Sequence, residues 1–176
     1  MNEQISPFQT PARLSEAGVS LRALGEADFP FLRLLYRMLR WDEFAPTQWP
    51  DETKAAFLDQ QFSFQHRHYV TCYDGAEFYV IAHGAEPIGR FYIDRVTRDR
   101  VVVEISLLPE WRGRGIGSAL LTALQEEVTA GCADRVSLHV ETGNPARALY
   151  ARLGFVEVKP PDEFPRLDIE MVWLAP

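Results

Sequence analysis

A glycine-rich turn between two apolar stretches contains the residues whose types and spacing point most clearly to chemistry. It has glycines at alternate positions with arginines among them: Arg112, Gly113, Arg114, Gly115, Ile116, Gly117 and Ser118. Residues 101–108 before it have the pattern of a strand, and residues 118–124 after it have the pattern of a helix. The first N–H groups of a helix have no partner inside the helix and carry the positive end of its dipole, so they bind anions. Because arginine adds donors for phosphate oxygens, the turn predicts a phosphate or pyrophosphate site.

Two common nucleotide-binding patterns do not fit this turn. A P-loop requires a lysine and a hydroxyl residue after its last glycine, whereas Ser118 and Ala119 follow Gly117 here. A dinucleotide-binding turn has the spacing G-x-G-x-x-G and an acidic residue about 20 positions later that closes the next strand. The spacing here is G-x-G-x-G, Asp134 precedes the next apolar run, and Glu141 closes that run too late. We therefore disfavour both nucleotide readings.

Two motifs of the chain resemble those of the GCN5-related N-acetyltransferase (GNAT) family. The family pattern Q/R-x-x-G-x-G/A matches residues 112–117 at every specified position. Residues 144–155 match a second pattern, in which an asparagine opens a short helix and an alanine, a tyrosine and a closing Gly-Phe follow. The resemblance is clear over residues 77–155 and weak before them. It implies an α/β fold with a mixed, mainly antiparallel twisted sheet of about seven strands flanked by about four helices.

The resemblance also implies acetyl-CoA as a cosubstrate, no metal, and a set of residues that hold the cosubstrate. Residues 112–118 would bind the pyrophosphate, chiefly through backbone amides, and the end of the preceding strand would contact the acetyl group and the pantetheine amides. Pro109 lacks an N–H group, which is consistent with a strand that stops pairing there and splays open. The expected cosubstrate-binding residues outside the glycine turn are Ser106, Leu107, Leu108, Asn144, Ala146, Arg147 and Tyr150.

Acetyl transfer to an amine requires a deprotonated amine, and Glu104 is the candidate general base. Strand alternation places Glu104 on one face with Val102, Ser106 and Leu108. Burial of a carboxylate in an apolar strand costs free energy of folding unless the group is solvated or paired, so such a residue can indicate a function. The resemblance implies a base that often acts through water. The alternative is a structural glutamate that faces solvent or pairs with an arginine such as Arg90 or Arg95.

The same reaction requires a proton for the departing CoA thiolate, and Tyr150 is the candidate donor. It lies six residues after Asn144, at the tyrosine position of the second motif. A phenol has an ordinary pKa of about 10, so it suits a donor better than a base at neutral pH. The alternative is a core aromatic residue that packs beside Leu149 and Phe155.

Hydrophobic periodicity, turn residues and capping residues predict the elements that position these groups. The expected helices cover residues 26–39, 51–66, 114–130 and 144–152, and the expected strands cover residues 19–24, 77–83, 86–95, 100–108, 135–140, 154–158 and 167–174. Residues 40–50 are expected to form a loop. The last two strands should form a hairpin with Pro160 and Pro161 in its loop. We predict one domain over residues 1–176, with residues 1–17 as a loose leader.

Composition limits the environment and the partners. The net charge of −7 opposes binding to nucleic acid and mildly favours a cationic acceptor, although it is also an ordinary charge for solubility. No apolar run approaches the roughly 20 residues that span a bilayer, so no membrane segment is expected. The first residues show no secretory pattern, and Cys72 and Cys132 have no metal-ligand spacing. We expect reduced thiols and a cytoplasmic protein.

The leading hypothesis is an acetyl-CoA-dependent N-acetyltransferase that acts on a primary amine of a small molecule by direct attack in a ternary complex. The acceptor pocket is expected at residues 41–44, 51–66 and 162–164, where acidic and aromatic side chains could hold a cation. These residues are also those of an ordinary solvated loop with apolar anchors. The alternatives are a protein or peptide N-acetyltransferase and a non-catalytic acyl-CoA-binding module. Homodimers are common among relatives, and no feature of the sequence tests this.

Overall fold

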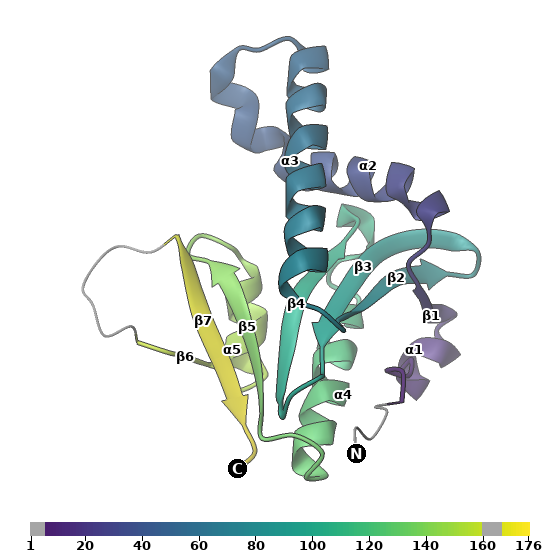
Figure 1. Ribbon diagram of the computed structural model, residues 1–176, viewed down its shortest axis with the longest axis vertical. Helices are drawn as coiled ribbons and strands as arrows, with labels where there is room; N and C mark the ends of the chain where they lie inside the picture. The colour runs from purple at the N-terminus through teal and green to yellow at the C-terminus, as the bar shows by residue number, and fades with distance from the viewer. Residues whose placement is uncertain (1–5, 160–166) are drawn as a thin grey trace.

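Seven strands form a single sheet in a computed structural model that describes residues 6–159 and 167–176 (Figure 1). The strands are β1 Val19–Ala23, β2 Glu77–His83, β3 Glu86–Asp94, β4 Asp99–Leu107, β5 Arg135–Glu141, β6 Val156–Glu157 and β7 Asp168–Leu174. Their order is β1-β2-β3-β4-β5-β7-β6, and all neighbours are antiparallel except β4 and β5. The predicted mixed, mainly antiparallel sheet is confirmed. The predicted loop at Pro160 and Pro161 and residues 162–164 lie outside the described residues.

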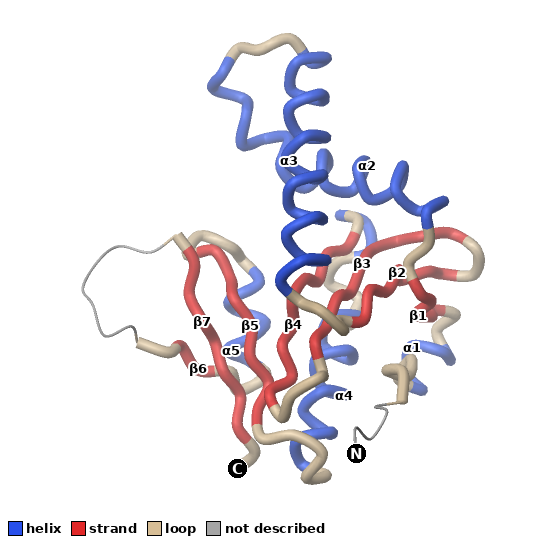
Figure 2. Tube along the Cα trace, in the orientation of Figure 1, coloured by secondary structure: helices blue, strands red, loops and turns tan. Residues whose placement is uncertain are grey.

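Helices cover both faces of this sheet (Figures 1 and 2). They are α1 Ala12–Glu16, α2 Phe29–Arg40, α3 Asp51–Cys72, α4 Ile116–Thr129 and α5 Ala146–Arg152. Figure 1 shows α3 across one face, with α2 beside it, and α4 and α5 behind the sheet. Short 3-10 turns precede or follow three of these helices: η1 Glu26–Asp28, η2 Trp41–Thr47 and η3 Pro109–Trp111.

The main core lies between the sheet and α4. The predicted apolar stripe of this helix is buried in full and consists of Ile116, Leu120, Leu124 and Val128. Burial of one such side chain contributes about 1.5–3 kcal/mol, so this stripe fixes α4, and with it the glycine turn, against the strands. Gly131 has a φ of 79° and ends the helix where the sequence predicts.

Helix α3 is longer than the sequence predicts. The pattern ends at His66, but the helix continues to Cys72 and brings Tyr69 over the sheet. A second, smaller core joins α3 to α2 through Leu32, Leu58 and Phe62. The helix thereby covers the middle strands on the face opposite α4.

The expectation of a loose leader is wrong for residues 6–17. Phe8 and Leu14 are buried in the main core, and the ring of Phe8 packs 5.7 Å from that of Phe91. The backbone N–H of Phe8 also donates to Glu77 at 2.8 Å. This segment has few apolar residues, but the two buried ones, Phe8 and Leu14, anchor it to the main core.

A bulge and a divergence of strands set the geometry of β4. Tyr92 pairs with Glu104, whereas Ile93 pairs with Val102, so Val103 is an extra residue in β4. The simple alternation predicted for this strand is therefore wrong at one point. Val102 faces the main core with its partner Ile93, and Glu104 faces α3 with its partner Tyr92.

The parallel pairing of β4 with β5 ends at Val102 and Leu138. Beyond this pair, β4 continues along β3 to Leu107, and β5 continues along β7 to Glu141. The two strands therefore separate well before Pro109, the residue at which the sequence predicted that β4 splays open. The separation of the two strands, called the gap below, leaves unpaired the edge of β4 that leads to the glycine turn.

Within residues 6–159 and 167–176, none of the helices has both the length and the apolar character that crossing a bilayer requires. Cys72 and Cys132 are free and exposed.

Candidate active site

The glycine turn opens directly into α4. Gly113 and Gly115 have φ values of 71° and 80°, which only glycine adopts without strain. The first backbone hydrogen bond of the helix runs from Ala119 N to Gly115 O at 2.9 Å. The N–H groups of Ile116, Gly117 and Ser118 therefore precede the internal hydrogen bonds of α4 and are available to an anion. A Cβ atom added at Gly113 would meet nothing within 4 Å, so the turn leaves open space beside these donors.

The two arginines of the turn brace the loop through their Nε atoms. Arg112 donates to Leu107 O at 3.2 Å, and Arg114 donates to Glu110 O at 3.0 Å. The guanidinium of Arg114 also lies 4.7 Å from the ring centroid of Trp111. Both side chains are exposed beyond these contacts. The amides and the charge of the turn fit a pyrophosphate, as the sequence predicts.

At Gly117 the small size of the residue matters for packing, whereas its conformational freedom is not required. A Cβ atom there would lie 3.5 Å from Leu149 and 3.7 Å from Ile105, which are ordinary contact distances. Alanine would therefore fit at this position. This agrees with the family pattern, which accepts either glycine or alanine at the last position.

Glu104 lies in a hydrogen-bonded cluster beneath α3. Tyr69 donates to its Oε2 at 3.1 Å, Ser106 donates to its Oε1, and Arg90 forms an ion pair with it at 3.1 Å. The side chain of Glu104 is 17% exposed and that of Arg90 is 2% exposed. Of the two readings of Glu104, the structure shows the pairing with Arg90. Glu104 lies on the stretch of β4 that no longer pairs with β5.

Arg90 is the most buried cation of this cluster. Its Nη2 also donates to Gln65 at 2.9 Å, and its guanidinium lies 5.5 Å from the ring centroid of Tyr92. Burial opposes its charge, but the neighbouring Glu104 carboxylate raises its pKa. Gln65 lies within residues 51–66, where the acceptor pocket is expected, whereas the sequence did not identify Tyr69 as a site residue. Tyr69 lies seven residues after Phe62, so continued helical spacing was the signal that could have found it.

Tyr150 lies in α5 and is part of the main core of the protein. It is 6% exposed and packs 6.0 Å from Phe155, within the core on the side of α4 and α5. Burial, and secondarily the negative charge of Glu104, raises the pKa of Tyr150 to about 12. Tyr150 therefore remains protonated at neutral pH.

The second motif holds the turn between β5 and α5. Asn144 Oδ1 accepts from Ala146 N at 2.9 Å, so the side chain satisfies the first N–H group of α5 from the position before the N-cap, Pro145. Arg147 donates to Thr142 O at 2.7 Å and forms an ion pair with Glu157. The contacts of Arg147 thus tie the turn to β6, and its expected role toward the cosubstrate stays a prediction.

A group of charged and aromatic residues borders the gap on the α3 side. Arg40, at the end of α2, forms ion pairs with Glu43 at 2.8 Å and with Glu141 at 3.5 Å. The second pair spans from α2 to the end of β5, across the opening of the gap. Tyr36 is buried beside this group, and burial raises its pKa while the charges of Arg40 and Arg90 lower it. Phe44 stacks on Trp49 and packs against the small core that contains Tyr36.

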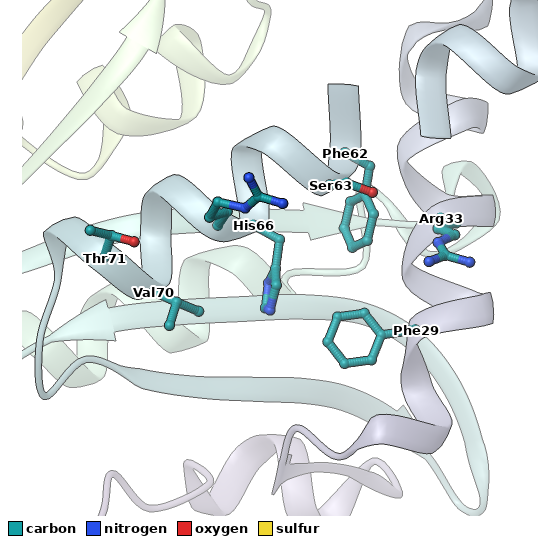
Figure 3. Close-up of a pocket in the computed structure, with 8 residues that line it drawn as sticks. Phe29, Arg33, Phe62, Ser63, His66, Val70 and Thr71 are labelled. Carbon is teal, nitrogen blue, oxygen red and sulfur yellow. The ribbon is translucent and has the colours of Figure 1, made fainter. Parts of the chain in front are cut away.

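A separate hollow of about 330 Å³ lies between α2 and α3 (Figure 3). It is lined by Phe29, Arg33, Phe62, Ser63, His66, Arg67, Val70 and Thr71. In Figure 3, the ring of His66 lies beside those of Phe29 and Phe62, and its centroid is 4.9 Å and 6.0 Å from theirs. Burial, together with the charge of Arg90, lowers the pKa of His66. Its lining contains neither Glu104 nor Tyr150, so it is not part of the site described above.

Comparison with known proteins agrees with this geometry. A model of the acetyltransferase (GNAT) family matches residues 34–155. A mycothiol acetyltransferase from Corynebacterium aurimucosum is 52% identical over 56 residues, which cover 31% of this chain and 18% of that protein. The matched region is thus less than a fifth of that relative.

Solved structures share the fold over nearly the whole chain. The PaiA N-acetyltransferase from Thermoplasma acidophilum, in complex with coenzyme A, has a TM-score of 0.63 and 16% identity, with 89% of this chain and 99% of that chain covered. The spermidine N-acetyltransferase from Vibrio cholerae, in complex with CoA and spermine, has a TM-score of 0.58 and 24% identity, with 90% and 96% covered. The family match extends over well over half of the sequence and includes the glycine turn, the divergent strands and Tyr150. The protein is an acetyltransferase of the GNAT family.

Proposed function

We propose that the protein transfers the acetyl group of acetyl-CoA to a primary amine of a small molecule by direct attack in a ternary complex. One observation carries the proposal. Strand β4 stops pairing with β5 after Val102, so the stretch of β4 that carries Glu104 has an unpaired edge, and this edge leads to the anion-binding turn.

The cosubstrate is bound along β4. Amides at the start of α4 bind the pyrophosphate, and the backbone of Ser106, Leu107 and Leu108 contacts the pantetheine and the acetyl group along the edge that β5 leaves unpaired. This arrangement fixes the thioester between Glu104 and Tyr150. Holding the reacting groups in place removes much of the entropic barrier to a two-substrate reaction.

The reaction requires two proton transfers, one to Glu104 and one from Tyr150. The amine nitrogen attacks the thioester carbon and loses a proton toward Glu104, either directly or through the Ser106 hydroxyl that donates to this carboxylate. The carbon–sulfur bond then breaks, and Tyr150 gives its proton to the CoA sulfur. With a pKa of about 12, the phenol is fully protonated at the start of each turnover.

The acceptor side supports a small amine over a protein segment. Glu43, Glu104 and Glu141 share two arginines, Arg40 and Arg90, so one negative charge is left over, and the ion pair from Arg40 to Glu141 bridges the end of α2 and the end of β5. A bridged opening suits a compact cation better than an extended peptide. Two relatives are named a spermidine N-acetyltransferase and a mycothiol acetyltransferase, whereas RimL is named an acetyltransferase of a ribosomal protein, so the choice of a small amine rests on the site and not on these names.

An acceptor screen tests this function. Release of CoA is followed with polyamines, amino acids, aminoglycosides and short peptides, with Tyr150→Phe as the matched control. Turnover with a small amine that falls in the control supports the proposal. Turnover with peptides alone would assign a peptide acceptor, and tight binding of acetyl-CoA without turnover of any amine would favour a non-catalytic module.

A further inference from the structure

The anion-binding turn has a neighbour from the other end of the chain. The guanidinium of Arg13, in α1, lies 3.7 Å from the position that a Cβ atom would occupy on Gly115. Gly115 is the residue that begins α4, and Figure 1 shows α1 beside that helix. Arg13 is outside the region that the family model matches. Neither of the two sequence motifs includes it.

The Arg13 guanidinium is exposed and uncommitted. No hydrogen bond or ion pair connects it to any residue within 6–159 or 167–176, including Glu16 one helical turn later. Arg112 and Arg114, in contrast, use their Nε atoms to brace the turn. An unpaired guanidinium next to free helix N–H groups is a further donor for phosphate oxygens.

The helix that carries Arg13 is fixed in place. Leu14 is buried in the main core next to it, and Phe8 is anchored by Glu77 and by the cation–π contact with Arg95 at 5.4 Å. Gly18, with a φ of 73°, ends the segment and accepts a hydrogen bond from Gly84 N at 3.1 Å. The backbone of Arg13 is therefore positioned before any ligand arrives, so little backbone ordering opposes binding.

We propose that Arg13 binds a phosphate group of the CoA cosubstrate and that the N-terminal segment is thereby part of the cosubstrate site. The inference rests on the proposed function, because it assigns a further residue to the same CoA site. The chemistry recognised is a phosphate, which CoA presents both as its pyrophosphate and as its 3′-phosphate.

Binding measurements on the full-length protein test this assignment. Affinities for CoA, dephospho-CoA and pantetheine are measured by calorimetry, or by competition against acetyl-CoA, for the wild type, Arg13→Gln and Arg13→Lys. Arg67→Gln is the matched control, since it removes the same charge from an exposed site on α3. Loss of one exposed charge-assisted contact should weaken CoA binding by about three- to tenfold in Arg13→Gln, with partial recovery in Arg13→Lys.

The three ligands separate the outcomes. If Arg13→Gln binds dephospho-CoA more weakly than the wild type does, Arg13 contacts the pyrophosphate. If the two proteins bind dephospho-CoA equally well and only CoA binding is weakened, Arg13 contacts the 3′-phosphate. Either result supports the proposal. Equal affinity of Arg13→Gln and Arg67→Gln for CoA overturns it, as does an equal loss with pantetheine, which has no phosphate. Absence of CoA binding by the wild type would overturn the proposed function itself.

Discussion

Substitution of Gly89 by alanine should displace the end of β4 that lies along the proposed cosubstrate site. Gly89 pairs with Leu107, and an added Cβ atom would lie 2.3 Å from Ser106 O and 2.8 Å from Leu107 Cδ2. Contacts between carbon and a carbonyl oxygen normally begin near 3.3 Å, so the backbone of one strand must move by about 1 Å. A side-chain rearrangement cannot relieve the clash, because the nearest atom belongs to the main chain.

Two effects follow. Overpacking of this kind typically costs about 1–3 kcal/mol of the free energy of unfolding. Misplacement of a substrate-positioning group by about 1 Å can lower kcat by about 100-fold, which corresponds to about 2.7 kcal/mol of activation free energy. Ser106 would carry part of this loss, because it also donates to Glu104.

The assay compares Gly89→Ala with Gly143→Ala. A Cβ atom at Gly143 meets nothing within 4 Å, so that control should unfold within about 0.5 kcal/mol of the wild type. Urea unfolding gives the free energies, and CoA release gives kcat and KM. A Gly89→Ala variant with wild-type stability and kcat would refute the view that close pairing with β3 fixes this end of β4.

Two further variants test the buried charges. Glu104→Gln leaves Arg90 without its carboxylate and should destabilise the fold by about 3–5 kcal/mol in urea unfolding, whereas Glu104→Asp should retain most of the stability. In the same variant, the rate of CoA release should fall most at low pH, where the amine is mostly protonated; a loss independent of pH would indicate a structural role alone. Burial raises the pKa of Glu77, but Arg95, Tyr79 and the Phe8 N–H outweigh it and lower the pKa overall. Its contribution to stability is therefore full at neutral pH and is lost as the pH falls below about 4, so Glu77→Gln should flatten the acid side of the stability profile measured by urea unfolding; an unchanged slope would contradict this.

The sequence motifs predicted the sheet, the turn and Tyr150 because these features depend on local signals. The glycines at 113 and 115 are required by their positive φ values, and the stripe on α4 is visible as a period of 3.6 residues. Asn144 satisfies the first N–H group of α5 through a contact only two residues long. Local geometry is what a single sequence records most directly.

The remaining features depend on contacts between distant segments. The bulge at Val103 reverses the alternation that placed Glu104 with Val102, and no glycine or proline marks it. Tyr69 reaches Glu104 over 35 positions, and Arg95 reaches Ser6 over 89. Residues 6–17 were predicted to be loose because their few apolar side chains show no hydrophobic periodicity, but contacts with distant segments hold them in place. The place where β4 and β5 diverge is likewise a property of the sheet and not of either strand alone.

Single-turnover acetyl transfer by Tyr150→Phe tests the central claim most directly. The enzyme is loaded with acetyl-CoA and mixed with the best amine of the screen, and CoA release is followed from pH 6 to 9. Because the phenol has a pKa of about 12, it stays protonated over this range, and its removal should lower the rate by about 100-fold or more at every pH while acetyl-CoA still binds. An unchanged rate across the range would contradict the assignment of Tyr150 as the donor to the CoA thiolate.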